Sequence, residues 1–385
     1  MTTKSKTEYA MITAKRYFKA AARKEKTKIL DEYCATLGCN RKYAINKFRI
    51  INYVGPPGQR KNRKRLYSGE ADAAVIKIWE TLGCICAERV YPQISESIRI
   101  LEKFGHIKLS DSVKEELLSM SRATIGRRIM SHEKRFGRGK GLSTTKPGSL
   151  LKKHIPIQTQ CWNTNIAGFI EMDTVAHCGE SLNGEFINTL QMVDIETTWT
   201  ERKAVMGKSQ HSILDAIKKA GTQFPFVIRG LDSDNGSEFI NHLLLNYCKS
   251  KGIMFTRSRP YMKKDNAHIE QKNWTLVRKV LGYDRFDTQH QLMLINDLYD
   301  NELRQFINFF QPTLKLSSKE RFGARVIKKY APAKTPYQRV LDSADVPSEK
   351  KEELKALYAT LDPVKLRRNI DKKIGIIISL VRLGF

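Results

Sequence analysis

The segment FPFVIRGLDSDNGSEFI, residues 224–240, most constrains what this chain can fold into. An Asp-Asn-Gly triplet between apolar runs is typical of a tight hairpin turn. Here the two flanks differ, because residues 226–228 form an apolar run that predicts a strand, whereas residues 239–247 carry apolar side chains at helical spacing. The segment therefore predicts a buried strand that turns directly into a helix, with Asp232 and Asp234 at the carboxyl end of the strand.

The middle of the chain repeats this alternation of strands and helices. Strands are expected at 167–175, 184–195, 200–206, near 226–234 and at 253–258; helices are expected at 209–221, 237–252 and in the second half of 260–282. Three strands followed by alternating helices and strands are typical of a mixed sheet with helices packed against it. We therefore expect an α/β core over residues 161–312.

The charge of the chain is strongly positive and unevenly distributed. The formal net charge of +28 divides into +18 for residues 1–150, +1 for residues 151–300 and +9 for residues 301–385. Such an excess costs self-repulsion, which contacts with phosphates would relieve. Basic flanks around a nearly neutral centre predict that the ends hold a polyanion and that the centre carries the chemistry.

Residues 1–54 predict a helix-turn-helix domain. In YCATLGCNRKYAINKF the small Cys34 lies in the first helix, Gly38 at the turn and Asn40 at the N-cap of the second helix. The second helix would pack Ala44, Ile45 and Phe48. It would present to DNA the polar residues Arg41, Lys42, Asn46 and Lys47.

A basic linker, residues 55–66, follows a Pro/Gly break. It carries Arg60, Lys61, Arg63, Lys64 and Arg65. Such segments lie along phosphates or in a minor groove when they belong to DNA-binding domains; a solvated charge run or a nuclear address is the alternative.

A second helix-turn-helix domain is expected over residues 67–137. In LLSMSRATIGRRIM, Ser121 is placed to cap the second helix, while Thr124 and Ile125 lie where a recognition helix packs. Three arginines, Arg122, Arg127 and Arg128, are then available to DNA. Residues 138–160, rich in Gly, Ser, Thr, Pro and Lys, are expected to form a further linker.

Three carboxylates of the middle region have the placement of a metal site. Asp173 lies in the first strand, Asp234 ends a later strand, and Glu270 begins the long helix. Two strands and a helix start can bring such groups together at one sheet edge, where carboxylate oxygens hold hard divalent ions. We expect Asp194 and Asp232 to serve turns or surface contacts, His268 to face DNA or solvent, and Trp199 and Trp274 to be core aromatics.

These motifs resemble those of the DDE transposase and retroviral-type integrase superfamily, whose core is RNase H-like. FIEMDT resembles the first-Asp strand, SDNGSEF the second-Asp turn, and RPYMKKDNAHIEQKN the Glu helix, with 35 residues between Asp234 and Glu270. The resemblance covers roughly residues 160–312 and implies that Asp173, Asp234 and Glu270 are the catalytic triad and hold two Mg²⁺ or Mn²⁺ ions. Lys263, Lys264 and Arg278, which lie around this Glu motif, are expected to contact DNA.

The helical domains before the core make the chain most similar to a prokaryotic insertion-sequence transposase. Two departures are visible: no His-His-Cys-Cys zinc domain is present, and Val277 stands where many relatives carry Lys or Arg, with Arg278 beside it. Residues 313–385 form a basic, mainly helical C-terminal region rather than the small β-barrel of retroviral integrases.

The resemblance implies a transposase that cleaves and transfers DNA strands. Its partners would be double-stranded DNA, from the element ends and the target, and a second copy of the chain, as a homodimer or larger assembly on DNA. Two alternatives remain: a catalytically silent DNA-binding regulator, or an RNase H-like nuclease or resolvase. The need for an accessory ATPase, the end sequences and the copy or cut pathway stay open.

The remaining sequence features argue against zinc and membrane. Seven cysteines include no CxxC pair, which makes a structural zinc site improbable. No apolar signal core begins the chain, and the longest apolar run, IGIIISLV, is too short to span a bilayer. We expect a soluble, cytoplasmic, nucleoid-associated protein.

Overall fold

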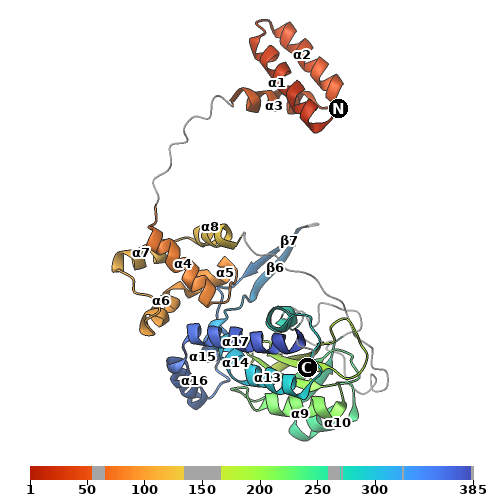
Figure 1. Cartoon of the computed structure of the whole chain (residues 1–385), viewed down its shortest axis with the longest axis vertical. Coiled ribbons are helices and arrows are strands. Elements are labelled where there is room, and N and C mark those ends of the chain that lie inside the picture. Colours follow the sequence, from red (N-terminus) through yellow and green to blue (C-terminus); the bar gives the residue numbers. More distant parts are fainter. Residues whose placement is uncertain (54–65, 134–165, 259–268, 270–271, 323–324, 383–385) are drawn as a thin grey trace. The chain divides into compact units, whose positions relative to one another are not determined.

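The computed structural model describes residues 1–53, 66–133, 166–258, 269, 272–322 and 325–382. The chain divides into two compact units, Met1–Leu66 and Tyr67–Phe385, each described by itself (Figure 1).

The first unit is a bundle of three helices. They are α1 (Thr3–Lys19), α2 (Arg23–Leu37) and α3 (Arg41–Tyr53). Gly38 ends α2 in the left-handed conformation, with φ of 62°, which glycine adopts without steric cost. Asn40 then caps α3, because its side-chain oxygen accepts a 2.7 Å hydrogen bond from the Tyr43 backbone. The expected turn and cap between these two helices are confirmed.

The core of this bundle is small and aromatic. Tyr33 and Phe48, both fully buried, pack edge to face with ring centroids 4.8 Å apart. Ala44 is also fully buried and Ile45 packs at the margin, as the spacing of these residues predicts. Aromatic pairs of this kind add to simple area burial in holding a small bundle together.

The second unit begins with a helical module around its own apolar core. Its elements are α4 (Gly69–Thr81), α5 (Ala87–Val90), the 3₁₀ turn η1 (Tyr91–Gln93), α6 (Ile94–Lys103), α7 (Asp111–Ser119) and α8 (Arg122–Glu133). Ser121 caps α8 as expected, accepting a 3.2 Å hydrogen bond from the Thr124 backbone. Ile125 and Ile129 of α8 are buried against this core.

A five-stranded mixed sheet forms the centre of the second unit. Its strands are β1 (Phe169–Ala176), β2 (Ile187–Asp194), β3 (Thr200–Met206), β4 (Gly230–Ser233) and β5 (Met254–Arg257), in the order β3-β2-β1-β4-β5. β1 pairs antiparallel with β2 and parallel with β4, and β4 pairs parallel with β5. This arrangement confirms the mixed sheet predicted from the alternation of elements.

Helices cover both sides of this sheet. They are α9 (Gln210–Gly221), α10 (His242–Lys251), the π-helical η2 (Asn273–Arg278), α12 (Lys279–Leu281), α13 (Gln289–Asp300), α14 (Glu302–Gln305) and the π-helical η3 (Phe306–Phe310). Figure 1 shows α9 and α10 together on one side, with α13, α14 and α17 on the other. The apolar side chains of the sheet and of these helices form one large hydrophobic core.

One strand was predicted too early in the sequence. The apolar run 226–228 is not a strand: Phe226 is buried, Val227 is 78% exposed, and β4 begins only at Gly230. The central parallel strand is short: it is paired on both edges, runs only from Gly230 to Ser233 and ends just before Asp234. The following helix α10 likewise starts at His242, after an Asn241 N-cap, and Phe239 is buried in the turn.

The C-terminal region is mainly helical, as predicted, and also contains a hairpin that the sequence analysis did not anticipate. Its elements are β6 (Leu316–Phe322), β7 (Arg325–Tyr330), α15 (Pro336–Asp342), α16 (Ser348–Thr360) and α17 (Pro363–Arg382). The two strands pair only with each other, as a separate antiparallel ribbon.

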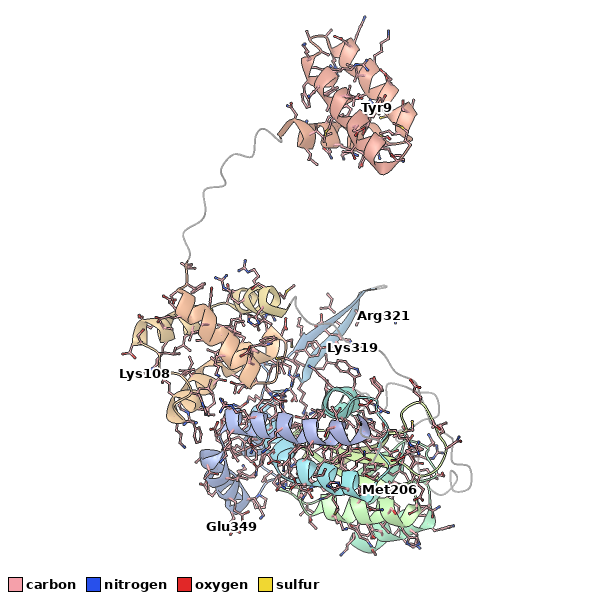
Figure 2. The ribbon with its side chains drawn as sticks, viewed as in Figure 1. Tyr9, Lys108, Met206, Lys319, Arg321 and Glu349 are labelled. Atoms are coloured by element: carbon pink, nitrogen blue, oxygen red, sulfur yellow. The ribbon has the colours of Figure 1, made fainter. Side chains whose placement is uncertain are left out.

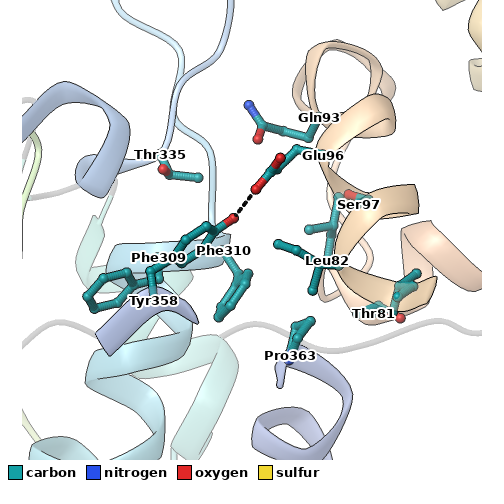
Figure 3. Close-up of a pocket in the computed structure, with 12 residues that line it drawn as sticks. Thr81, Leu82, Gln93, Glu96, Ser97, Phe309, Phe310, Thr335, Tyr358 and Pro363 are labelled. Atoms are coloured by element: carbon teal, nitrogen blue, oxygen red, sulfur yellow. Dashed lines mark hydrogen bonds between the residues drawn. The ribbon is translucent and has the colours of Figure 1, made fainter. Parts of the chain in front are cut away.

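The C-terminal helices join the helical module to the core. The hydroxyl of Tyr358 in α16 donates a 2.7 Å hydrogen bond to Glu96 of α6, beside Phe309 and Phe310 of η3 (Figure 3). His106 lies 2.8 Å from the carboxylate of Asp362, at the start of α17. Residues far apart in the sequence therefore form one body over Tyr67–Phe385.

Candidate active site

Asp173 and Asp234 stand at the same level of two neighbouring strands. In the parallel pairing of β1 with β4, Met172 lies opposite Ser233. The residue that follows each of them is an aspartate, Asp173 after Met172 and Asp234 after Ser233. β4 ends at Ser233, which places Asp234 at its carboxyl end. The structure thus brings two of the three predicted acids together at one sheet edge.

The carboxylate of Asp173 is held from two sides. One oxygen accepts a 2.7 Å hydrogen bond from the Thr174 backbone, and the other accepts a 2.6 Å hydrogen bond from the side-chain amide of Asn273. Burial raises the pKa of Asp173 to about 7, and the negative charge of Asp234 contributes to the rise. This carboxylate therefore sits where a positive charge would be favourable.

Asp234 is fixed by the turn that follows it. Its carboxylate accepts a 2.9 Å hydrogen bond from the Gly236 backbone. A β-carbon at residue 236 would lie 2.6 Å from an oxygen of Glu238 and 2.9 Å from one of Asp234, so a larger residue there would displace these carboxylates. Burial raises the pKa of Asp234, and the charge of Glu238 acts in the same direction.

Glu238 and Lys208 form a charged pair beside these acids that the sequence analysis missed. The Glu238 carboxylate, 8% exposed, accepts a 3.0 Å hydrogen bond from Thr174 and lies 3.1 Å from the Lys208 ammonium. Thr174 directly follows Asp173, so the pair braces the end of β1. The sequence did contain a signal for Glu238, because this glutamate belongs to the motif SDNGSEF, five residues after Ser233.

Glu270, the third predicted acid, lies outside the described residues. On either side of it, however, two described residues contact β1. The backbone of Ile269 donates a 3.1 Å hydrogen bond to Glu171, and Asn273 reaches Asp173.

A buried polar row runs across the sheet from Asp173. In the strand register Asp173 lies opposite Gln191 of β2, which lies opposite Arg202 of β3. Arg202 is 2% exposed; its guanidinium stands 5.5 Å from the ring centre of Tyr299, and burial lowers its pKa to about 10. The row ends in a buried positive charge on the same face as the carboxylates.

Of the two acids expected to serve turns or surface contacts, Asp194 does so and Asp232 does not. Asp194 accepts hydrogen bonds from the backbones of Gly168 and Thr197, at 2.8 and 2.7 Å, and thereby closes the turn between β2 and β3. Asp232 is not at a turn or on the surface: it is fully buried and accepts a 2.5 Å hydrogen bond from Thr256 of β5.

The donor set fits a hard divalent cation. Asp173 and Asp234 offer carboxylate oxygens, and their pKa values are raised by burial first and by neighbouring acids second, so that a bound cation would favour their ionised forms. Within the described residues no three His, Cys, Asp or Glu side chains meet as a complete metal site.

The predicted DNA contacts of the first unit are surface residues. Arg41 and Lys42 are exposed at the start of α3, and Arg41 forms an ion pair of 2.5 Å with Asp31. Lys47 lies 5.7 Å from the ring centre of Tyr43. The predicted linker and loop contacts fall outside the described residues; they are Arg60, Lys61, Arg63, Lys64, Arg65, Lys263 and Lys264.

The three arginines of α8 differ in their surroundings. Arg122 and Arg127 are exposed, and Arg127 donates a 3.2 Å hydrogen bond to Thr124. Arg128 instead forms a 2.7 Å ion pair with Asp72 of α4. Arg122 and Arg127 therefore face solvent, whereas Arg128 is held against α4 of the helical module.

Trp274 was wrongly predicted to be a core aromatic. It is 58% exposed, whereas Trp199 is fully buried against Phe309, as predicted. Trp274 lies in η2, which is π-helical, and a π-helix turns its side chains to other faces than an α-helix does. In the same helix Val277 is fully buried, while Arg278 stacks on the ring of Tyr283 at 4.9 Å.

Comparisons with known proteins agree with this arrangement. The family model described as integrase core domain matches residues 166–263, a stretch that contains Asp173 and Asp234. An uncharacterized protein, y4rM of Sinorhizobium fredii, is 36% identical over 336 residues, which cover 87% of this chain and 95% of that protein.

Solved structures of integrase cores are also similar. The catalytic core domain of BIV integrase covers 46% of this chain and 95% of its own, at 18% identity and a TM-score of 0.31. The HTLV-2 integrase catalytic core domain in complex with magnesium covers 38% of this chain and 91% of its own, at 13% identity and a TM-score of 0.29. No helix of the described residues is long and apolar enough to cross a membrane.

Proposed function

The chain belongs to the DDE transposase and integrase superfamily, and from this premise we propose that it is a DNA transposase. It would bind the ends of a mobile element and catalyse cleavage and transfer of DNA strands. The distribution of charge supports this division of labour, since residues 1–150 carry +18 and residues 151–300 only +1.

The observation that carries the proposal is the placement of Asp173 and Asp234 at one level of two parallel strands. We propose that Glu270 completes a triad with them and that the three acids hold two Mg²⁺ or Mn²⁺ ions. When bound, such ions supply the positive charge that phosphoryl transfer between DNA strands requires.

The residues around the triad would orient it and would not react themselves. Asn273 and the Thr174 backbone hold the Asp173 carboxylate, and the Gly236 backbone holds that of Asp234. Water would attack the phosphate first and the freed 3′-hydroxyl would attack the target strand, each in an in-line displacement without a covalent intermediate with the protein.

The helical modules would recognise the element ends. Arg122 and Arg127 of α8 are exposed and can reach base edges, while the Arg41 and Lys42 side chains of α3 can contact a second part of the site. Because two element ends must be paired for transfer, we propose that the active assembly on DNA contains at least two copies of the chain.

The test is a strand cleavage and joining assay on oligonucleotides from the element's own ends, with Mg²⁺ or Mn²⁺. Asp173→Asn, Asp234→Asn and Glu270→Gln should each abolish both steps and leave end binding intact, because each swap removes a ligand charge but keeps the shape. Asp232→Asn is the matched control: it lies two residues from Asp234 but contacts Thr256, and should retain cleavage.

The two alternatives give different outcomes in the same assay. A regulator would bind the ends without cleaving them under any metal. An RNase H-like nuclease or resolvase would cut with metal but would neither prefer the element ends nor join strands. Cleavage by a triad variant at the wild-type rate would remove that residue from the proposed site.

A further inference from the structure

The β6–β7 ribbon stands apart from the rest of the second unit. Within the described residues, no other helix or strand packs broadly against either strand, and Figure 1 shows the ribbon extending beyond the helices at its base. Its described side chains are exposed, except Ser318, which is half-buried. A two-stranded hairpin is marginally stable by itself, so its form calls for an explanation.

One face of this ribbon is cationic. Because paired residues of an antiparallel ribbon share a face, the register places Lys319 opposite Lys328 and Arg321 opposite Val326 on the same side. We call these four residues the cationic face; Figure 2 labels Lys319 and Arg321 on it. The opposite face carries Glu320, which pairs with Lys329 at 3.5 Å.

The direct opposition of two lysines is unfavourable in the free protein. Like charges facing each other across two strands destabilise the pairing. Among the described residues neither Lys319 nor Lys328 has an acidic partner within ion-pair distance. A polyanion that lay along this face would relieve the repulsion and release its own counterions.

The base of the ribbon is fastened to the turn between β2 and β3, which adjoins the amino end of β1. Thr313 and Lys334 close the ribbon by a backbone bridge, and the Thr313 hydroxyl lies 2.9 Å from that of Thr198 in the turn after β2. Lys315 forms an ion pair with Glu196 of the same turn.

That turn also meets the helix of the site. The Lys272 ammonium donates a 3.4 Å hydrogen bond to the Thr198 carbonyl, and the neighbouring Asn273 contacts Asp173. The ribbon is thus attached through one turn to the segment that orients a proposed catalytic carboxylate.

We propose that the cationic face of the β6–β7 ribbon binds duplex DNA through its phosphates, without regard to sequence. A two-stranded ribbon has the width of a B-DNA groove. Lys319 and Lys328 can meet phosphates as point charges, and Arg321 on the same face can meet a phosphate with two parallel hydrogen bonds. The proposal rests on the proposed function for its partner, DNA, but not for any catalytic step.

The test uses the full chain and a scrambled duplex, without metal. The double variant Lys319→Glu/Lys328→Glu should weaken binding by about tenfold or more and should lower the slope of log affinity against log salt by about 2, one for each lost phosphate contact. The matched control is Lys219→Glu/Lys249→Glu, which reverses two exposed charges on α9 and α10 and should change affinity by less than about threefold.

Two outcomes would overturn the proposal. Equal losses in the ribbon and control variants would mean that net charge alone matters; unchanged binding by the ribbon variant would mean that the face meets solvent or an acidic protein instead. Thermal unfolding of both variants checks that the fold is kept. Because no cleavage is measured, a chain that fails as a transposase can still bind through the ribbon, and the reverse also holds.

Discussion

The side-chain amide of Asn273 donates a 2.6 Å hydrogen bond to the carboxylate of Asp173, which joins the π-helical η2 to the central strand β1. The other end of this amide, its oxygen, is buried and has no hydrogen-bond partner among the described residues. Because only the nitrogen of an Asn side chain donates, the contact fixes which way the amide faces. Asn273 therefore positions the Asp173 carboxylate.

We predict that Asn273→Ala lowers the rate of strand cleavage by about 10–100-fold, the usual cost of removing a group that orients a metal ligand. Binding to end DNA should not change, since Asn273 lies behind the carboxylate. Asn273→Asp should be worse than Ala, because it places a like charge against Asp173. Lys279→Ala, an exposed change six residues further on, is the control. If Asn273→Ala were as active as Lys279→Ala, the positioning role of Asn273 would be contradicted.

The pair Lys208 and Glu238 gives a prediction about stability. Lys208→Met leaves the buried Glu238 carboxylate with only its hydrogen bond from Thr174 and should cost about 1–3 kcal/mol in the free energy of unfolding. Adding Glu238→Gln should recover part of that loss, because the orphaned charge is removed. Urea unfolding of the two single variants and the double variant gives the coupling energy, and strictly additive losses would show that the two side chains act independently.

Much of the fold was predictable because local and long-range signals agree. β3 begins and ends at the predicted residues, Thr200 and Met206, although this edge strand is buried along most of its length. β4 was misplaced because it is buried on both faces and so short that its apolar neighbours at 226–228 dominate the pattern. The β6–β7 ribbon was missed because its strands are polar and exposed, and so lack the alternation that marks a half-buried strand.

The residues of the candidate site also include some that the sequence could predict and some that it could not. Asp173 and Asp234 were predictable because each ends or follows an apolar strand run, and motif context adds to that signal. The roles of Asn273 and Lys208 were not predictable, because they depend on contacts between residues far apart in the sequence. The π-helix η2 brings Asn273 to Asp173, and the tertiary fold brings Lys208 to Glu238. Trp274 shows the same limit: its large aromatic side chain suggested a core position, whereas in the π-helix it is 58% exposed.

The start of α17 gives a prediction about pH. Asp362 accepts hydrogen bonds from the backbones of Val364 and Lys365, at 2.9 and 3.2 Å, and pairs with His106. Burial alone would raise the pKa of Asp362, but these hydrogen bonds, led by that of His106, hold it below its ordinary value near 3.8. The ionised form is therefore favoured in the folded chain, and Asp362→Asn should lower the free energy of unfolding at neutral pH by about 1 kcal/mol, the order of one net hydrogen bond.

The direction of the pH dependence of stability follows from the lowered pKa of Asp362. The stabilisation that ionised Asp362 contributes is fully present above the ordinary pKa of the carboxyl group. It is lost as the pH falls below about 4 and through the lower pKa that Asp362 has in the folded chain. The difference in unfolding free energy between wild type and Asp362→Asn should therefore shrink between neutral pH and about pH 3. Asp371→Asn, an exposed change in the same helix, is the control and should give a small difference at all pH values. A gap for Asp362→Asn that stayed constant with pH would contradict the argument.

The last prediction separates the three arginines of α8. Arg128 is paired with Asp72 of α4, so Arg128→Ala should lower the stability of the helical module by about 1 kcal/mol and change DNA specificity little. Arg122 and Arg127 are exposed, so each Ala variant should keep its stability and lose about 1–3 kcal/mol of discrimination at particular base pairs of the element end. Binding to the end and to scrambled duplex at several salt concentrations, together with thermal unfolding, distinguishes the two effects. Equal losses on both DNAs for Arg122→Ala and Arg127→Ala would reduce these arginines to phosphate contacts, and a specificity change in Arg128→Ala would mean that its ion pair with Asp72 opens on DNA.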